Sequence, residues 1–157
     1  MRDAVQRGLW YEELETDVRY LHRPGRTLTE ADNVAFTTMT MNTQPLHLDA
    51  AWSAGQPFGR PLVNSMLTLA TLVGSSVAQL TQGTLVANLG LTDVDFPHPL
   101  FPGDTLYSET VVTGKRLSAS REGQGVVTFA HTGRNQDGTV VATATRTVLL
   151  WRAGAQP

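Results

Sequence analysis

Apolar residues between positions 61 and 80 repeat at three- and four-residue intervals, the spacing of one face of an α-helix. Pro61 suits the first turn of this helix, and Gly83 marks its end. Intervening apolar residues widen the face until it covers most of the circumference, which is typical of a buried helix. A long buried helix is therefore predicted here, with its repeating face made of Leu62, Met66, Leu69, Val73, Val77 and Leu80.

After Gly83 the pattern changes to strands. "TLVANLGLTDVDF" is a candidate strand, ended by the proline-rich turn "PHPLFPGD". Three long segments rich in Thr and Val follow, "TLYSETVVTGKRLS", "GVVTFAHTGRNQ" and "TVVATATRTVLLWR". Asp137-Gly138 between the last two is a strong hairpin signal. Such strands after a buried helix predict an α+β fold, in which a curved antiparallel sheet wraps the long central helix as in a hot-dog domain.

The segment before the central helix carries weaker helix signals. Thr29 can cap a helix over "TLTEADNVAFTTMT", with Asp32 three positions on. Pro45 limits that helix, because the residue before a proline is disfavoured in the α region. A short helical turn is predicted from Asp49 to Ser53, and "GQPFGRP" after it is a loop.

The composition is that of one ordinary globular domain. The chain has 157 residues, of which 41% are hydrophobic and 17% are charged, so we expect a single domain over residues 1–157. The low charged fraction suggests that a partner subunit covers part of the surface. A net charge of −2 without basic clusters argues against nucleic-acid binding.

Several kinds of site are disfavoured by residue type. The chain has no cysteine, so no disulfide, thiolate nucleophile or cysteine-based metal site is expected, which fits a cytoplasmic location. Its four histidines lack the spacing of a metal site. Polar residues interrupt the apolar region from 61 to 80, so we expect no membrane span, and the N-terminus lacks a signal-peptide core.

Two stretches carry a family resemblance over nearly the whole chain. "TEADNVAFTTMTMNTQPLHLDAAWSAGQPFGRPLVNSM" followed by "FPGDTLYSETVV" resembles the MaoC-like dehydratases, relatives of the R-specific enoyl-CoA hydratases. The order of helix, proline-histidine turn, central helix and PGDTL turn is specific, whereas PGDTL alone recurs in other hot-dog proteins. The resemblance implies a lyase that adds water to an acyl-CoA substrate, with no metal or redox cofactor, since coenzyme A is part of the substrate.

The chain departs from the family pattern at the acid. That pattern reads roughly Asp-x-Asn-Pro-x-His, so its histidine falls on His47 and its aspartate on Asn42. The family's asparagine falls on Gln44, and its His-Gly at the mouth of the central helix falls on Asn64 and Ser65. In these features the chain is similar to a branch that includes mesaconyl-CoA and itaconyl-CoA hydratase-like proteins.

The resemblance implies three catalytic roles. His47 is expected to be the base, because a histidine titrates near neutral pH. Asn42 cannot exchange a proton but can hold the attacking water, and capping its own helix is an equal alternative. Ser65 is expected to offer its backbone N–H to the enolate-like oxygen. The proton donor stays open between His47 itself and four other residues, namely Asp49, Asp93, Asp95 and His98.

Other residues are expected around the substrate. Arg60 could read a substrate carboxylate, or bind loop carbonyls or the phosphates of coenzyme A. His98 could line the pocket or be a solvated loop residue, and Asp104 is expected to stabilise its own turn. The full set of expected substrate-binding residues is Gln44, Arg60, Asn64, Val73, Gly74 and His98.

The resemblance thus implies a homodimeric or larger homo-oligomeric hydratase of a 2-enoyl-CoA, with branched and dicarboxylic acyl groups among the candidate substrates. Two rival functions remain. An acyl-CoA thioesterase would usually need a carboxylate near the thioester, which Asn42 does not supply. A non-catalytic acyl-CoA-binding hot-dog protein would explain the loss of the family's aspartate.

Overall fold

The structure is a computed structural model that describes residues 1–156. One short 3₁₀ helix, η1 (Tyr11–Glu13), precedes the first strand. The elements that follow are β1 (Arg19–Thr27), α1 (Glu30–Met39), α2 (Pro45–Leu48), α3 (Ala50–Ala54), α4 (Ser65–Leu80), β2 (Leu85–Asp95), β3 (Thr105–Leu117), β4 (Gln124–Arg134) and β5 (Val140–Trp151).

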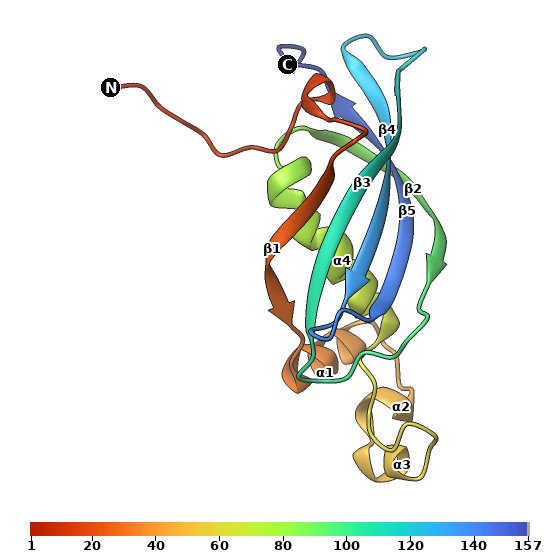
Figure 1. The fold of residues 1–157 in the computed structure, drawn as a ribbon. Coiled ribbons are helices and arrows are strands. Elements are labelled where there is room, and N and C mark those ends of the chain that lie inside the picture. Colours follow the sequence, from red (N-terminus) through yellow and green to blue (C-terminus); the bar gives the residue numbers. More distant parts are fainter. Residues whose placement is uncertain (157) are drawn as a thin grey trace.

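The strands form one antiparallel sheet in the order β1-β3-β4-β5-β2. Figure 1 shows this sheet curving around α4, with α1, α2 and α3 gathered at the end far from the chain termini. The α+β class and the hot-dog arrangement expected from the sequence are therefore confirmed. The hairpin predicted at Asp137-Gly138 is also present, and Gly138 has a φ of 80°, which glycine adopts readily.

The central helix differs from its prediction in two respects. It begins at Ser65 rather than Pro61, because Val63 N–H donates to the Leu100 carbonyl and holds the preceding segment extended. Its most exposed large side chain is Met66, which belongs to the face predicted to be buried. A single row of α4 is fully buried against the sheet, because no layer formed by residues 1–156 covers the opposite side of the helix. That row is Thr68, Leu72, Ser76 and Leu80.

The early helices follow their sequence signals, whereas β1 was not predicted. Thr29 caps α1 in a capping box with Asp32, as expected. The short α3 is capped by Asp49, whose Oδ1 accepts the Trp52 N–H at 2.8 Å. β1 has few β-branched residues and contains Pro24, so its sequence does not read as a strand; pairing with β3 creates it.

A row of polar side chains crosses the core between α4 and the sheet. His22 Nδ1 lies 2.7 Å from Gln79 Oε1, and His22 Nε2 lies 2.8 Å from Thr110 Oγ1. The same hydroxyl lies 2.8 Å from His131 Nδ1. Arg146, also buried, donates from Nε to Asn88 Oδ1 at 2.8 Å. This polar row separates two hydrophobic clusters, one around Phe129 and one around Leu72.

Candidate active site

His47 lies half-buried on the single turn of α2, and its ring is held by one backbone carbonyl. Nδ1 is 2.9 Å from the Leu62 carbonyl oxygen. A carbonyl only accepts, so Nδ1 carries the hydrogen in the neutral ring and Nε2 keeps its lone pair. Leu62 is itself fixed by its N–H, which donates to the Leu46 carbonyl at 3.0 Å. The contact therefore prepares Nε2 to accept a proton.

The turn before His47 explains the position of Asn42. α1 ends at Met39, and Met41 in the turn that follows has a φ of 60°. The Asn42 N–H then donates to the Thr37 carbonyl at 3.0 Å. Asn42 Oδ1 accepts the Gln44 N–H at 2.9 Å, so the side chain closes the turn that leads to Pro45. It does not cap the carbonyls of α1, which was the alternative role. Its NH₂ group is the part left to meet a ligand or water.

The N-terminus of α4 supplies the second feature of the site. Asn64 is buried, and its Oδ1 accepts the Met66 N–H at 3.0 Å while its Nδ2 donates to Thr37 Oγ1 at 3.2 Å. Ser65 is the first residue of this 16-residue helix, and its N–H has no acceptor among residues 1–156. A free N–H at a helix N-terminus favours negative charge. Asn64 thus caps the helix and leaves the Ser65 N–H available.

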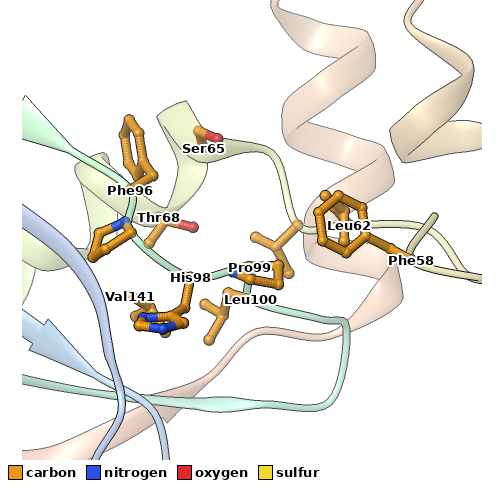
Figure 2. Close-up of a pocket in the computed structure, with 11 residues that line it drawn as sticks. Phe58, Leu62, Ser65, Thr68, Phe96, His98, Pro99, Leu100 and Val141 are labelled. Carbon is orange, nitrogen blue, oxygen red and sulfur yellow. The ribbon is translucent and has the colours of Figure 1, made fainter.

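Two cavities open beside these groups. Ser65, Thr68 and His98 line one of about 290 Å³, whose other walls are mostly apolar (Figure 2). His47 lines another of about 200 Å³, together with Arg60 and residues of α1. The structure therefore does not place His47 and Ser65 in one cavity. The segment 61–62 connects them, since Pro61 lines the cavity of His47 and Leu62 lines that of Ser65.

The remaining predicted residues divide between the cavities and the surface. The guanidinium carbon of Arg60 lies 3.8 Å from the centroid of the Phe101 ring, and this contact links two loops. Arg60 is exposed and lines the cavity of His47. His98 Nδ1 is 2.9 Å from the Val140 carbonyl, so its Nε2 is also the unprotonated nitrogen of the neutral ring. Gln44 and Gly74 are exposed and Val73 is half-buried, and none of these three lines either cavity.

Three of the candidate proton donors line neither cavity. Asp49 is engaged in capping α3. Asp93 and Asp95 are exposed on β2, and Asp93 Oδ2 accepts from the Thr92 hydroxyl at 3.0 Å. Among the four alternatives to His47, only His98 lines the cavity of Ser65.

Among residues 1–156, no three His, Asp or Glu side chains are grouped as metal ligands would be. No helix in that part of the chain is long and apolar enough to cross a membrane.

Asp104 has contacts that agree with the structural role expected for it. Its Oδ2 accepts the Phe101 N–H at 2.8 Å and its Oδ1 accepts from Gln136 Nε2 at 2.9 Å. We expect Asp104→Ala to lower the free energy of unfolding by about 1–3 kcal/mol in a urea titration, because both donors lose a charged acceptor. Gln136→Ala removes only the second contact and should have a smaller effect. Loss of turnover at unchanged stability would contradict the structural role.

The chain is similar in sequence to known proteins over most of its length. Residues 13–135 match the family described as MaoC like domain. The (R)-specific enoyl-CoA hydratase of Aeromonas caviae is 33% identical over 120 residues, which cover 76% of this chain and 84% of that protein. The mesaconyl-CoA hydratase of Haloarcula marismortui is 27% identical over 135 residues, which cover 86% of this chain and 37% of that protein.

A solved structure supports the hot-dog fold of this chain. A Mycobacterium tuberculosis protein described as having a double hot-dog fold superposes with a TM-score of 0.83 at 25% identity. The match covers 96% of this chain and 46% of that one, so this chain corresponds to about half of it. The similarity to the enoyl-CoA hydratase supports a hydratase or dehydratase role in general. The match of residues 13–135 to the family and the 33% identity to the enoyl-CoA hydratase together show that the chain belongs to the MaoC-like domain family.

Proposed function

We propose that this protein catalyses the reversible addition of water to a 2-enoyl-CoA thioester. The observation that carries the proposal is the contact between His47 Nδ1 and the Leu62 carbonyl. It fixes the neutral tautomer whose Nε2 can take a proton from water, which is the first requirement of hydration. The (R)-specific enoyl-CoA hydratase among the relatives supports this reaction class.

The first half of the reaction is addition at C3. His47 Nε2 removes a proton from water while the water oxygen bonds to C3, and the C2–C3 double-bond electrons move toward the thioester carbonyl. The NH₂ of Asn42 holds the water oxygen, since its own carbonyl oxygen is occupied by the Gln44 N–H. The Ser65 N–H stabilises the negative charge that develops on the thioester oxygen.

The second half returns the proton. The enolate re-forms the thioester carbonyl, and C2 takes a proton from the His47 imidazolium, which restores the neutral ring. Atoms and charge then balance with one water added and no metal or redox cofactor. This path places C3 near His47 and the carbonyl near Ser65, so the substrate must lie over the segment 61–62 that connects the two cavities.

The proposal includes a homodimer. β2 is an edge strand whose residues are largely exposed, including the hydrophobic Leu89 and Leu91. Met66 on the outer face of α4 is exposed as well. Pairing of two β2 edges would cover an unprotected strand and bring the two outer helix faces together. The double hot-dog relative, of which this chain matches about half, supports such a pairing.

Turnover of crotonyl-, mesaconyl- and itaconyl-CoA tests the function. Loss of the enoyl absorbance without release of free thiol is the expected result. Thiol release would instead identify a thioesterase. Binding of all three thioesters without turnover would support a non-catalytic acyl-CoA-binding protein, in which Asn42 marks the loss of the family's acid.

The substrate proposal is a dicarboxylic or branched acyl group, and Arg60 offers its test. Arg60→Met keeps the length of the side chain but removes the guanidinium. We expect KM to rise about 10- to 150-fold for mesaconyl-CoA and little for crotonyl-CoA, because a carboxylate–guanidinium contact contributes about 1.5–3 kcal/mol. An equal rise for both would assign Arg60 to the coenzyme A phosphates, and unchanged KM values would restrict it to its loop.

A further inference from the structure

The side chain of Asn33 joins three segments of the candidate site, although no sequence motif singles it out. It lies on α1 and is 1% exposed. Its Nδ2 donates to the Leu62 carbonyl at 3.0 Å and to the His47 carbonyl at 3.3 Å. Its Oδ1 accepts the Asn64 N–H at 2.8 Å. All three partners are backbone groups of the stretches that carry His47 and Ser65.

These partners fix the orientation of the amide. Two of them are carbonyls, which only accept, and the third is an N–H, which only donates. A flipped amide would set NH₂ against N–H and oxygen against oxygen, so only the observed orientation satisfies the group. The buried amide therefore holds these three backbone groups in place through hydrogen bonds of defined direction, in addition to occupying volume in the core.

The Leu62 carbonyl is the point where Asn33 meets the proposed base. It accepts from both Asn33 Nδ2 and His47 Nδ1. The direction of this carbonyl determines whether Nδ1 or Nε2 of His47 carries the hydrogen. Asn33 also holds the His47 carbonyl, so it restrains both ends of the contact.

The opposite end of the amide acts on the helix N-terminus. The Asn64 N–H bound by Oδ1 belongs to the residue immediately before Ser65. Asn64 is the N-cap of α4, so its backbone direction sets that of the Ser65 N–H. One side chain thus fixes the relative placement of the two proposed catalytic groups, which otherwise belong to different helices and line different cavities.

We infer that Asn33 is a positioning residue that holds the base nitrogen of His47 and the Ser65 N–H in register for hydration. This inference rests on the proposed function. It predicts that removing the amide alters the tautomer of His47 even when no substrate is present. A residue that only stabilised the fold would lower stability without that change.

The test uses Asn33→Leu, which keeps the shape of the side chain and removes its three hydrogen bonds. In ¹⁵N-detected NMR of labelled protein at pH 8, wild-type His47 should show the Nδ1–H tautomer, and the variant should show a mixture of both tautomers. We expect kcat to fall about 10- to 100-fold with a smaller change in KM, because displaced catalytic groups slow the chemical step. Asn33→Asp keeps an acceptor for the Asn64 N–H and should give the same change at His47.

The matched control removes an amide elsewhere. Asn135 Oδ1 accepts from the Asp137 and Thr139 N–H groups in the β4–β5 turn, so Asn135→Ala should lower stability and leave the His47 spectrum and kcat unchanged. An unaltered tautomer in both folded Asn33 variants would overturn the inference, as would failure of both to fold. If the wild type proves inactive toward enoyl-CoA, the NMR result still decides whether Asn33 orients His47.

Discussion

Replacing His47 by asparagine should greatly slow hydration while leaving the fold intact. The amide NH₂ of asparagine can reproduce the Nδ1–H donor to the Leu62 carbonyl, so the local backbone keeps its contact. The variant has no equivalent of Nε2 and cannot take a proton from water. We expect kcat/KM to fall about 10²- to 10⁴-fold, the usual contribution of general acid–base catalysis. The measurement is the initial rate with crotonyl-CoA at several pH values.

His98→Asn is the informative comparison for the proton donor. His98 makes the same kind of contact through Nδ1, with the Val140 carbonyl, but it lines the cavity of Ser65. If both variants lose turnover and the wild type has a bell-shaped pH profile, His98 returns the proton to C2. If only His47→Asn loses turnover, His47 acts as both base and acid. Retention of turnover in His47→Asn would exclude the proposed mechanism.

The parts of the fold with local signals could be predicted from the sequence. The capping box at Thr29, the hairpin at Asp137-Gly138 and the apolar periodicity of α4 are all local patterns, and all three correspond to observed elements. β1 could not be predicted, because its extended form depends on pairing with β3, far away in the chain. Of the face predicted for α4, only Leu80 belongs to the fully buried row, since periodicity alone does not show which side of the helix the sheet covers.

In the candidate site, too, local sequence motifs were recognised, whereas contacts between distant residues were not. His47, Asn42 and Ser65 were recognised by their place in a motif, and their roles stay predictions. Asn33 was missed because its importance comes from contacts with residues 14 to 31 positions away. The only sequence signal for it is an amide within a predicted helix, and such a residue is also common on exposed faces. The tautomer of His47 likewise depends on a distant carbonyl.

The polar row in the core was also not predicted, and it has a consequence for stability. Burial, the Arg146 guanidinium and the His22 imidazole lower the pKa of His131 to about 3 from the ordinary 6.5. Burial, partly opposed by the hydrogen bond to Gln79, also lowers the pKa of His22. Both histidines are therefore neutral in the folded protein at neutral pH. As the pH falls, both histidines are protonated in the unfolded state before they are protonated in the folded state.

We expect the protein to lose stability between pH 7 and pH 5. A histidine with a lowered pKa in the folded state contributes its full stabilisation above pH 6.5 and loses it as the pH falls toward the folded value. For His131 the loss by pH 5 is about 2 kcal/mol, from 1.5 pH units at about 1.4 kcal/mol each. Urea titrations at pH 7, 6 and 5 measure it. His22 adds to the same trend, because its pKa is shifted in the same direction.

Two variants separate this effect from general weakening of the core. His131→Gln removes the buried imidazole, so its free energy of unfolding should fall less steeply with acidification than that of the wild type. Phe129→Leu removes apolar volume beside His131, whose ring centroid lies 5.9 Å away, and should lower stability by a similar amount at every pH. Paired carboxylates do not interfere, because Glu13, with its pKa lowered to about 2, begins to lose stabilisation only below about pH 4.5. Parallel pH curves for wild type and His131→Gln would show that His131 is not the group responsible.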